Sequence, residues 1–355
     1  MSEKLLMKGN EAISEAAIQA GCRYFFGYPI TPQNEIPAYM SKRMPKVNGL
    51  YLQAESEVSA INMVYGAAGA GARVMTSSSS PGISLKQEGI SYIAGSELPC
   101  VIVNIVRGGP GLGGIQPAQS DYFQSVKGGG HGDYKLVVLV PSSVQEAVDM
   151  TIEAFDIADM YRMPVMILGD GLLGQMMEPV VFKSYEPRQI LEKTWGTTGT
   201  EGKRKPNIIN SLYIDPKDLE DKNIERFERY KYIEKNEVQV EVVDCEDVDI
   251  VLIAYGTMAR VVKSAMKIAR EQGYKVGVIR PLTVWPFPTE AICKVARTAK
   301  AFLTIEMSMG QMVEDVKLAV NGQKPVYFYG RTGGMVPTPN DIVEEIKKIS
   351  GGEKL

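Results

Sequence analysis

The sequence predicts an α/β protein made of two doubly wound domains, each with a mainly parallel sheet between layers of helices. Apolar runs of strand length alternate with amphipathic stretches of helix length in the first half of the chain and again toward its end. The run Pro99–Val106 is almost continuously apolar, which is typical of a strand buried on both faces. Because 355 residues exceed one ordinary domain, we expect two.

The first domain is predicted over residues 1–180. Its expected strands are Tyr24–Phe26, Leu50–Gln53, Arg73–Ser77, Pro99–Val106, Leu136–Val140 and Val165–Leu168. Its expected helices are Asn10–Ala20, Ser56–Ala70, Ser84–Ala94 and one that runs from the capping box Ser143-x-x-Glu146 to about Tyr161. Asn10 should cap the first of these helices, because its side-chain oxygen can accept a hydrogen bond from a helical N–H.

Residues 181–241 are predicted to be a linker or arm, because the alternation of strands and helices stops there. The segment Gly196–Pro206 is rich in Gly, Thr and charged residues, which is typical of a loop. The stretch Asp215–Asn236 is helical in pattern and strongly charged. Such a charge pattern favours a solvated surface, and the alternative is a surface that packs on a partner.

The second domain is predicted over residues 242–355 as another βα series of ordinary domain size. Its expected strands are Val248–Ala254, Lys275–Ile279, Ala301–Ile305 and Val326–Tyr329. Its expected helices are Met258–Gln272, Thr289–Thr298, Met309–Asn321 and Asp341–Ile349.

Composition and charge exclude several classes of function. The formal net charge of -3 disfavours nucleic-acid binding. No apolar run reaches the roughly 18 residues of a membrane span, and the first residues lack the apolar core of a signal peptide. The 4 cysteines are widely spaced and form no CxxC or Cys/His cluster, so we expect neither zinc nor an iron–sulfur cluster held by this chain alone. Reduced cysteines would suit a cytoplasmic protein.

A candidate pocket edge follows the first expected strand. The strand ends at Gly27, and a turn with two prolines leads to Thr31-Pro32. We predict that a helix starts there, with Thr31 as its cap and Pro32 as its first residue. A strand, a sharp turn and a capped helix would place a hydroxyl and free N–H groups beside a ligand.

Two acidic residues, Glu55 and Glu57, lie at the next junction from strand to helix. Acidic residues are favoured at any helix N-terminus, and that preference alone would explain both. The alternative is a carboxylate at the lip of a parallel sheet, where it could act as an acid or base if burial tunes its pKa.

Hydroxyl residues and an arginine follow the two central strands. The run Ser77–Gly82 is made of small residues, so it is either an ordinary turn or a surface that a ligand approaches closely. Arg107 ends the most apolar strand, where a lone buried charge would be costly. It requires an anion, which is either an internal Asp or Glu or the carboxylate of a substrate. The glycines after Arg107 do not match GxGxxG, so a dinucleotide site is disfavoured.

His131, the only histidine, stands among glycines in Gly128–Asp133. That setting indicates an exposed or hinge-like loop. A plain loop residue is favoured over a proton shuttle or a substrate contact.

Several motifs together resemble the α subunits of 2-oxoacid:ferredoxin oxidoreductases. Residues 28–32 are similar to the YPITP signature near the start of those subunits. The other similar segments are Gln53–Glu57, Thr76–Gly82, Glu97–Cys100, Gln116–Asp121, Gly256–Met258 and Arg280–Pro288. The resemblance covers nearly the whole chain and is greatest to the VorB-type subunits that act on 3-methyl-2-oxobutanoate (2-ketoisovalerate).

This resemblance implies a shared cofactor site. The first domain would be the pyrimidine-side domain of a thiamine diphosphate site, and the second would be similar to the C-terminal domain of transketolase. In the family a β subunit carrying GDG…NN holds the diphosphate with Mg²⁺, and a γ subunit and a ferredoxin-like iron–sulfur subunit complete the complex. Here Gly169-Asp170-Gly171 lacks the paired Asn, so we interpret it as a look-alike turn.

Roles for individual residues follow from the same resemblance. Glu57 matches the glutamate that touches the aminopyrimidine ring, which makes it both catalytic and cofactor-binding. Ser80 is also assigned to the cofactor. Thr31 and Arg107 match residues that contact the carboxylate of the 2-oxoacid. No metal ligand is expected in this chain, and no family role is assigned to His131.

The implied activity is the CoA-dependent oxidative decarboxylation of a branched-chain 2-oxoacid to an acyl-CoA and CO2. Electrons would pass to ferredoxin, and the chain would act only with its partner subunits. The same chemistry on 2-oxoglutarate or pyruvate is the runner-up. A non-catalytic scaffold subunit is the rival from another class, and the joint presence of Thr31, Glu57 and Arg107 argues against it. The sequence leaves the side-chain preference, the stoichiometry and the electron acceptor open.

Overall fold

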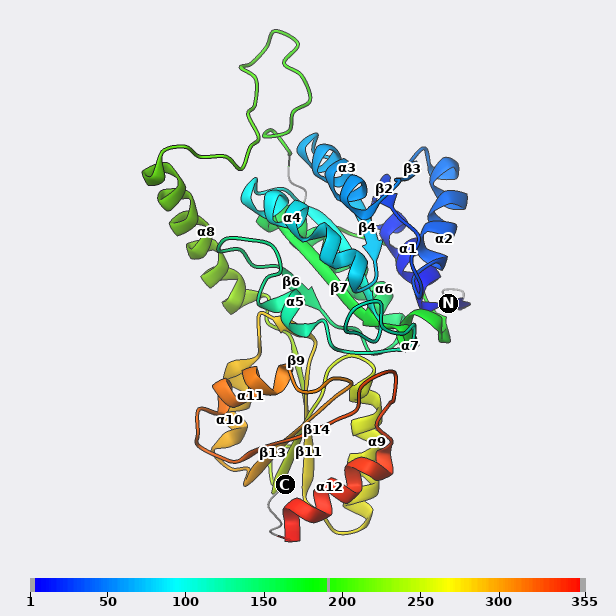
Figure 1. Ribbon diagram of the computed structural model, residues 1–355, viewed down its shortest axis with the longest axis vertical. Coiled ribbons are helices and arrows are strands. Elements are labelled where there is room, and N and C mark those ends of the chain that lie inside the picture. Colours follow the sequence, from blue (N-terminus) through cyan, green and yellow to red (C-terminus); the bar gives the residue numbers. More distant parts are fainter. Residues whose placement is uncertain (1–3, 190–191, 352–355) are drawn as a thin grey trace.

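A computed structural model describes residues 4–189 and 192–351 (Figure 1). The outermost residues of the predicted domains, and part of the start that lacks a signal-peptide core, lie outside these ranges. Two α/β bodies are stacked along the long axis of the molecule, and an extended loop with helix α8 (Pro216–Asn236) flanks the first (Figure 1). Within the described ranges, no helix has the length and apolar character needed to cross a bilayer.

The first body is built on a 7-stranded sheet with the order β12-β6-β7-β5-β4-β2-β3. Its strands are β2 (Tyr24–Gly27), β3 (Leu50–Gln53), β4 (Val74–Ser78), β5 (Cys100–Val106), β6 (Val137–Leu139), β7 (Pro164–Asp170) and β12 (Thr283–Trp285). Every described pairing in this sheet is parallel except that of β12 with β6. The small strands β1 (Leu5–Lys8) and β8 (Met177–Val180) form a separate antiparallel pair.

Helices cover both faces of this sheet (Figure 1). They are α1 (Gly9–Gln19), α2 (Glu35–Arg43), α3 (Glu57–Gly69), α4 (Pro81–Gly95), α5 (Tyr122–Val126), α6 (Val144–Tyr161), α7 (Gly171–Gln175) and the 3₁₀ turn η1 (Met44–Val47). Helix α1 packs against α6, and α3 packs against α4. Strand β5 is buried along its whole length, as its apolar sequence predicts.

The second body has a 5-stranded sheet with the order β14-β13-β10-β11-β9. Its strands are β9 (Val240–Val243), β10 (Ile250–Ile253), β11 (Val276–Pro281), β13 (Ala301–Glu306) and β14 (Val326–Gly330). Its helices are α9 (Met258–Glu271), α10 (Thr289–Ala296), α11 (Met312–Val320) and α12 (Pro339–Gly351). Only β9, at the edge, runs antiparallel among the described strands. The predicted fold of two doubly wound sheets is therefore confirmed.

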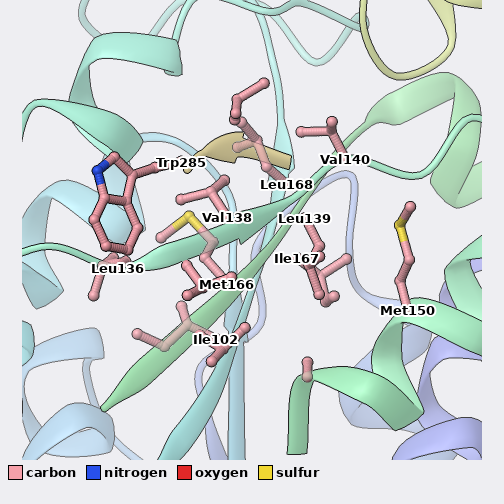
Figure 2. Packing of buried hydrophobic residues seen from close by; sticks show 14 of the residues in the cluster. Ile102, Leu136, Val138, Leu139, Val140, Met150, Met166, Ile167, Leu168 and Trp285 are labelled. Carbon is pink, nitrogen blue, oxygen red and sulfur yellow. The ribbon is translucent and has the colours of Figure 1, made fainter. Parts of the chain in front are cut away.

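Strand β12 joins the two bodies in a way that the sequence pattern does not predict. It comes from the second half of the chain but pairs with β6 at the edge of the first sheet, with Trp285 opposite Val138. Figure 2 shows the Trp285 indole beside Leu136 and Val138, next to the buried residues of β5 and β7. The first sheet is thus completed by residues that follow β11.

The predicted helix start at Thr31-Pro32 is wrong. Helix α2 begins at Glu35, and residues 31–34 form a turn. The Pro32 carbonyl, which would have opened the helix, instead accepts hydrogen bonds from Asn10 Nδ2 at 2.9 Å and Gln175 Nε2 at 3.1 Å. Asn10 is therefore not the predicted cap of α1: Lys8 holds that position, and Asn10 lies in the first turn.

Two other helices start three residues away from the predicted position. Helix α4 begins at Pro81 instead of Ser84, because proline suits the first position of a helix. Helix α11 begins at Met312 instead of Met309. The buried Glu306 carboxylate accepts hydrogen bonds from the backbone N–H groups of Gln311, Met312 and Val313, which fixes the start of that helix.

Helix α8 has one face on the first body and the other in solvent. Tyr230, Ile233 and Arg226 are buried, and the Tyr230 ring meets the Trp285 indole edge to face at 5.6 Å. Asp215 caps the helix through the N–H of Lys217, at 2.8 Å. The charged stretch therefore packs on its own chain through Tyr230 and Ile233, while other apolar residues of the helix, such as Ile224 and Tyr232, are exposed.

Candidate functional site

The residues singled out from the sequence gather at one edge of the first sheet. Neighbouring strands there have the order β5-β4-β2-β3, and all run parallel. Arg107 follows β5, Ser80 follows β4, Thr31 lies after β2, and Glu57 lies after β3. The carboxyl ends of parallel strands meet at a single edge, which is where open α/β sheets bind ligands.

Arg107 is only 8% exposed and has no carboxylate partner among the described residues. Its Nη1 donates to the Thr31 carbonyl at 3.0 Å and its Nη2 to the Leu112 carbonyl at 3.1 Å. Its Nε is buried without a partner. An internal Asp or Glu partner, the alternative left open by the sequence, is thus absent from this part of the chain. A buried guanidinium held only by neutral carbonyls can receive an anion.

Ser80 lies directly beside Arg107. Its Oγ accepts a hydrogen bond from the Arg107 backbone N–H at 3.1 Å, and its own N–H donates to Asn104 Oδ1 at 3.1 Å. Its φ of 26° lies in the region that side chains other than glycine rarely adopt. These hydrogen bonds hold the strained turn that leads from β4 into α4.

Asn104 and Asp121 support this turn, and neither was predicted from the sequence as a site residue. Both are buried, and Asn104 Nδ2 donates to Asp121 Oδ2 at 2.9 Å. Burial raises the pKa of Asp121, and the hydrogen bonds from Asn104 and Ser80 oppose that rise. The signal that could have identified Asn104 is a single amide within an otherwise apolar strand, because a buried amide requires partners.

Glu57 is the first residue of α3 and only 6% exposed. Ser56 caps the helix by accepting from the Ser59 N–H at 3.2 Å. Among the described residues, none donates a hydrogen bond to the Glu57 carboxylate. Glu55 differs, because it is exposed and its carboxylate accepts from Ser59 Oγ at 3.0 Å. The structure therefore separates by burial the two acids, of which the family resemblance had selected Glu57.

The Glu57 carboxylate lies against the start of α4. A Cβ placed on Gly82 would come within 2.6 Å of Glu57 Oε1 and 2.1 Å of Ser78 Oγ. The hydroxyls of Ser78 and Ser79 are buried and have no hydrogen-bond partner within the described chain. Such orphaned groups call for a ligand or ordered water. A carboxylate without a donor, near the Ser78 hydroxyl, fits a polar heterocycle that brings its own N–H groups.

The second body contacts the first through Gln119, which follows β5 in the chain. Gln119 Nε2 donates to the Tyr255 carbonyl at 3.0 Å, and its Oε1 accepts from the Met307 N–H at 3.0 Å. The Tyr255 hydroxyl in turn donates to the Gln119 carbonyl at 3.1 Å. The segment Gln116–Asp121, quoted above for its resemblance, therefore joins the two bodies at the carboxyl ends of β10 and β13.

Asp170 of the Gly-Asp-Gly turn is fully engaged in structure. Its Oδ1 caps α7 through the N–H groups of Leu172 and Leu173 at 2.8 and 3.1 Å, and its Oδ2 accepts from the Thr257 hydroxyl. Burial raises its pKa, and these hydrogen bonds oppose the rise. The interpretation as a look-alike turn agrees with this geometry. No cluster of three or more His, Cys, Asp or Glu residues suited to a metal occurs within the described ranges.

His131 lies away from the site described above. It is exposed, its Nδ1 is 3.3 Å from Ser91 Oγ, and its ring meets the Tyr92 ring edge to face at 6.0 Å. The expected exposed loop position is confirmed, and the preference for a plain loop residue over a proton shuttle or a substrate contact stays a prediction.

Comparison with protein families gives the class of protein. Residues 15–246 match the model described as pyruvate flavodoxin/ferredoxin oxidoreductase, thiamine diP-bdg. Residues 248–342 match pyruvate:ferredoxin oxidoreductase core domain II. The chain belongs to the 2-oxoacid:ferredoxin oxidoreductase family and carries its thiamine-diphosphate-binding domain.

Within that family the chain is a VorB-type subunit. It is 50% identical over 346 residues to the ketoisovalerate oxidoreductase subunit VorB of Methanothermobacter marburgensis, covering 98% of each chain. It is 36% identical over 387 residues to the 2-oxoglutarate synthase subunit KorA of Methanothermobacter thermautotrophicus, covering 99% of this chain and 100% of that one. These relatives are named subunits, so the chain is one component of a larger oxidoreductase.

Solved structures confirm the fold. A 2-oxoglutarate:ferredoxin oxidoreductase from Magnetococcus marinus, with 2-oxoglutarate, coenzyme A and succinyl-CoA bound, matches with a TM-score of 0.86 and 28% identity. The match covers 98% of this chain but only 65% of that longer one. A split-gene transketolase, an inactive beta4 tetramer, matches with a TM-score of 0.61 and 15% identity over 98% of this chain and 99% of that one, which shows the fold alone.

Proposed function

We propose that this chain is the α subunit of a complex that oxidatively decarboxylates 3-methyl-2-oxobutanoate to an acyl-CoA and CO2 and passes electrons to ferredoxin. Similarity to VorB subunits supports the substrate. One observation at the site carries the proposal. The same sheet edge holds Arg107, a buried arginine without a carboxylate partner among the described residues, and Glu57, a buried carboxylate without a hydrogen-bond donor there.

Each residue has a distinct part in this proposal. Arg107, through its guanidinium, and Thr31 bind the carboxylate that all 2-oxoacids share. Glu57 would contact the aminopyrimidine ring and hold or release a proton at its carboxylate, and Ser80 would shape the turn beside the cofactor. Thiamine diphosphate supplies the carbanion chemistry that breaks the bond beside the 2-oxo group. Because Glu57 is mostly shielded from water, its charge acts strongly there.

We further propose that a β subunit carrying GDG…NN covers this edge and holds Mg²⁺ with the diphosphate. Four aliphatic side chains next to site residues are exposed and would meet that subunit: Val58, Leu85, Leu112 and Ile115. A γ subunit and a ferredoxin-like iron–sulfur subunit would complete a cytoplasmic complex, in line with the free cysteines here. We keep the division into residues 1–180, 181–241 and 242–355 as part of the proposal.

The lone chain should therefore bind thiamine diphosphate weakly and show no turnover. The chain co-purified with its partners should bind the cofactor tightly and turn over the substrate. Calorimetry with Mg²⁺ and steady-state reduction of ferredoxin measure the two properties. Assays with 3-methyl-2-oxobutanoate, 2-oxoglutarate and pyruvate then rank the substrates. Micromolar binding of thiamine diphosphate by the lone chain would contradict the proposal of a shared site. A preference for 2-oxoglutarate would contradict the proposal that 3-methyl-2-oxobutanoate is the substrate.

Replacing Arg107 with lysine should weaken transition-state binding of every 2-oxoacid by a similar amount, about 1.5–3 kcal/mol per lost charged hydrogen bond. Lysine keeps the charge but loses the planar fork that can hold a carboxylate while also reaching the Thr31 and Leu112 carbonyls. The ratio of kcat/KM between variant and wild type, measured for three 2-oxoacids, checks this. A loss confined to one substrate would make Arg107 a side-chain selector instead.

A further inference from the structure

Lys86 is a buried cation for which the proposed reaction has no role so far. It lies on α4 with a fully buried side chain, one of the largest such side chains in the described chain. Its Nζ donates to Thr76 Oγ1 at 2.5 Å and to the Ser77 carbonyl at 3.1 Å. Both acceptors are neutral, and no described carboxylate forms an ion pair with it. A methionine would fill the same space at a lower cost in folding free energy, because an unpaired buried charge is unfavourable.

The packing of α3 on α4 directs this charge toward Glu57. Gly82 and Lys86 are four residues apart on α4, so they lie on one face of the helix. Gly82 is the residue that the Glu57 carboxylate touches, and Gly89, one turn further, meets Ile61 of α3 closely. The two glycines let the helices approach, with Lys86 between them. The same lysine anchors the end of β4, next to the orphaned Ser78 hydroxyl.

Electrostatics agree with this geometry. Burial lowers the pKa of Lys86 to about 7, and the charge of Glu57 opposes that fall. Cys100 of β5 acts on Lys86 in the same direction, but burial raises its own pKa to about 12, so it remains a neutral thiol. Glu57 is therefore the carboxylate whose charge acts on Lys86.

We propose that Lys86 is a positioning residue for Glu57. Its buried ammonium places a positive charge on the face of α4 that meets Glu57, and its hydrogen bonds hold the end of β4 beside that carboxylate. The inference rests on the proposed function, in which Glu57 exchanges a proton with the cofactor.

The first test measures pH profiles of kcat/KM for the assembled complex. Lys86→Met removes the charge at similar length, so the acid limb should move up by about one pH unit, since a nearby cation lowers a carboxyl pKa by 1–3 units. Lys300→Met is the matched control. Lys300 lies just before β13, its side chain is 74% exposed, and it forms an ion pair with Asp249. An acid limb that stays in place would overturn the inference.

A double substitution shows whether Lys86 acts through Glu57. In a Glu57→Gln background, Lys86→Met should cause no further loss of turnover, because the residue it serves is already neutral. An equal loss in both backgrounds would make Lys86 a structural residue and overturn the inference. Unchanged turnover in Glu57→Gln alone would instead overturn the proposed function, so the two failures are distinguishable.

A third measurement needs no cofactor and uses the full chain alone. Unfolded lysine titrates near its ordinary pKa of 10.5, so from about pH 7 to 10.5 the unfolded state binds more protons and the free energy of unfolding rises with pH. Below about pH 7 both states are protonated and the contribution of Lys86 is flat. Glu57→Gln should move the start of this rise to lower pH in urea titrations, and Lys86→Met should abolish it. A rise that Glu57→Gln leaves in place would show that the two residues are uncoupled.

Discussion

Replacing Glu57 with glutamine should lower the turnover of the assembled complex by about 10²–10⁴-fold, the usual cost of losing one acid/base function. Glutamine keeps the shape that packs against Gly82 but cannot exchange a proton. Because no described residue donates to the carboxylate, the substitution breaks no internal hydrogen bond and the complex should still assemble. Steady-state ferredoxin reduction gives the loss, and size-exclusion chromatography checks the assembly.

Glu55→Gln is the matched control for that experiment. Glu55 is two residues away, exposed, and bound to the Ser59 hydroxyl. Its loss should change turnover by much less than that of Glu57. If Glu55→Gln were the more damaging substitution, the catalytic carboxylate would be Glu55 and the assignment of Glu57 would be wrong.

Replacing Gln119 with alanine should lower the free energy of unfolding by about 2–6 kcal/mol, since each of the two buried groups left without a partner costs about 1–3 kcal/mol. The substitution removes the side chain that satisfies both the Tyr255 carbonyl and the Met307 N–H across the two bodies. Urea unfolding of the full chain measures the change.

Gln124→Ala serves as the control for Gln119. Gln124 is half-buried. Its Nε2 donates to the Ser84 hydroxyl at 2.8 Å within the first body, and its Oε1 has no partner among the described residues, so its loss should be within about 0.5 kcal/mol of wild type. If the two substitutions lowered the free energy of unfolding equally, the hydrogen bonds of Gln119 between the two bodies would contribute no more to stability than an ordinary surface hydrogen bond.

The sequence predicted the elements whose pattern is local. Strand β3 has the predicted limits, and β5 is buried throughout because its apolar run has no polar face. Helix α6 starts at the predicted capping box, where Ser143 Oγ accepts from the Glu146 N–H at 3.2 Å. Thr31, Glu57, Ser80 and Arg107 share one edge because parallel strands all end on the same side.

Features set by distant residues were not predictable. The start of α2 depends on Asn10 and Gln175, which take the Pro32 carbonyl from far along the chain. Lys86 stands in an ordinary amphipathic helix sequence, and its burial follows from how closely Gly82 and Gly89 let α3 approach. The family resemblance selects Glu57 over Glu55, but the difference in their burial requires coordinates, because acids are common at any helix N-terminus.

Strand β12 has a consequence for how this chain is made. The edge of β6 stays bare until residues 283–285 have been synthesised, so the first sheet cannot finish folding as an early, separate unit on the ribosome. An unpaired strand edge exposes a row of N–H and C=O groups that other chains can join. Fragments cut before Thr283 would therefore be prone to aggregate, whereas the intact chain carries its own strand to cover that edge.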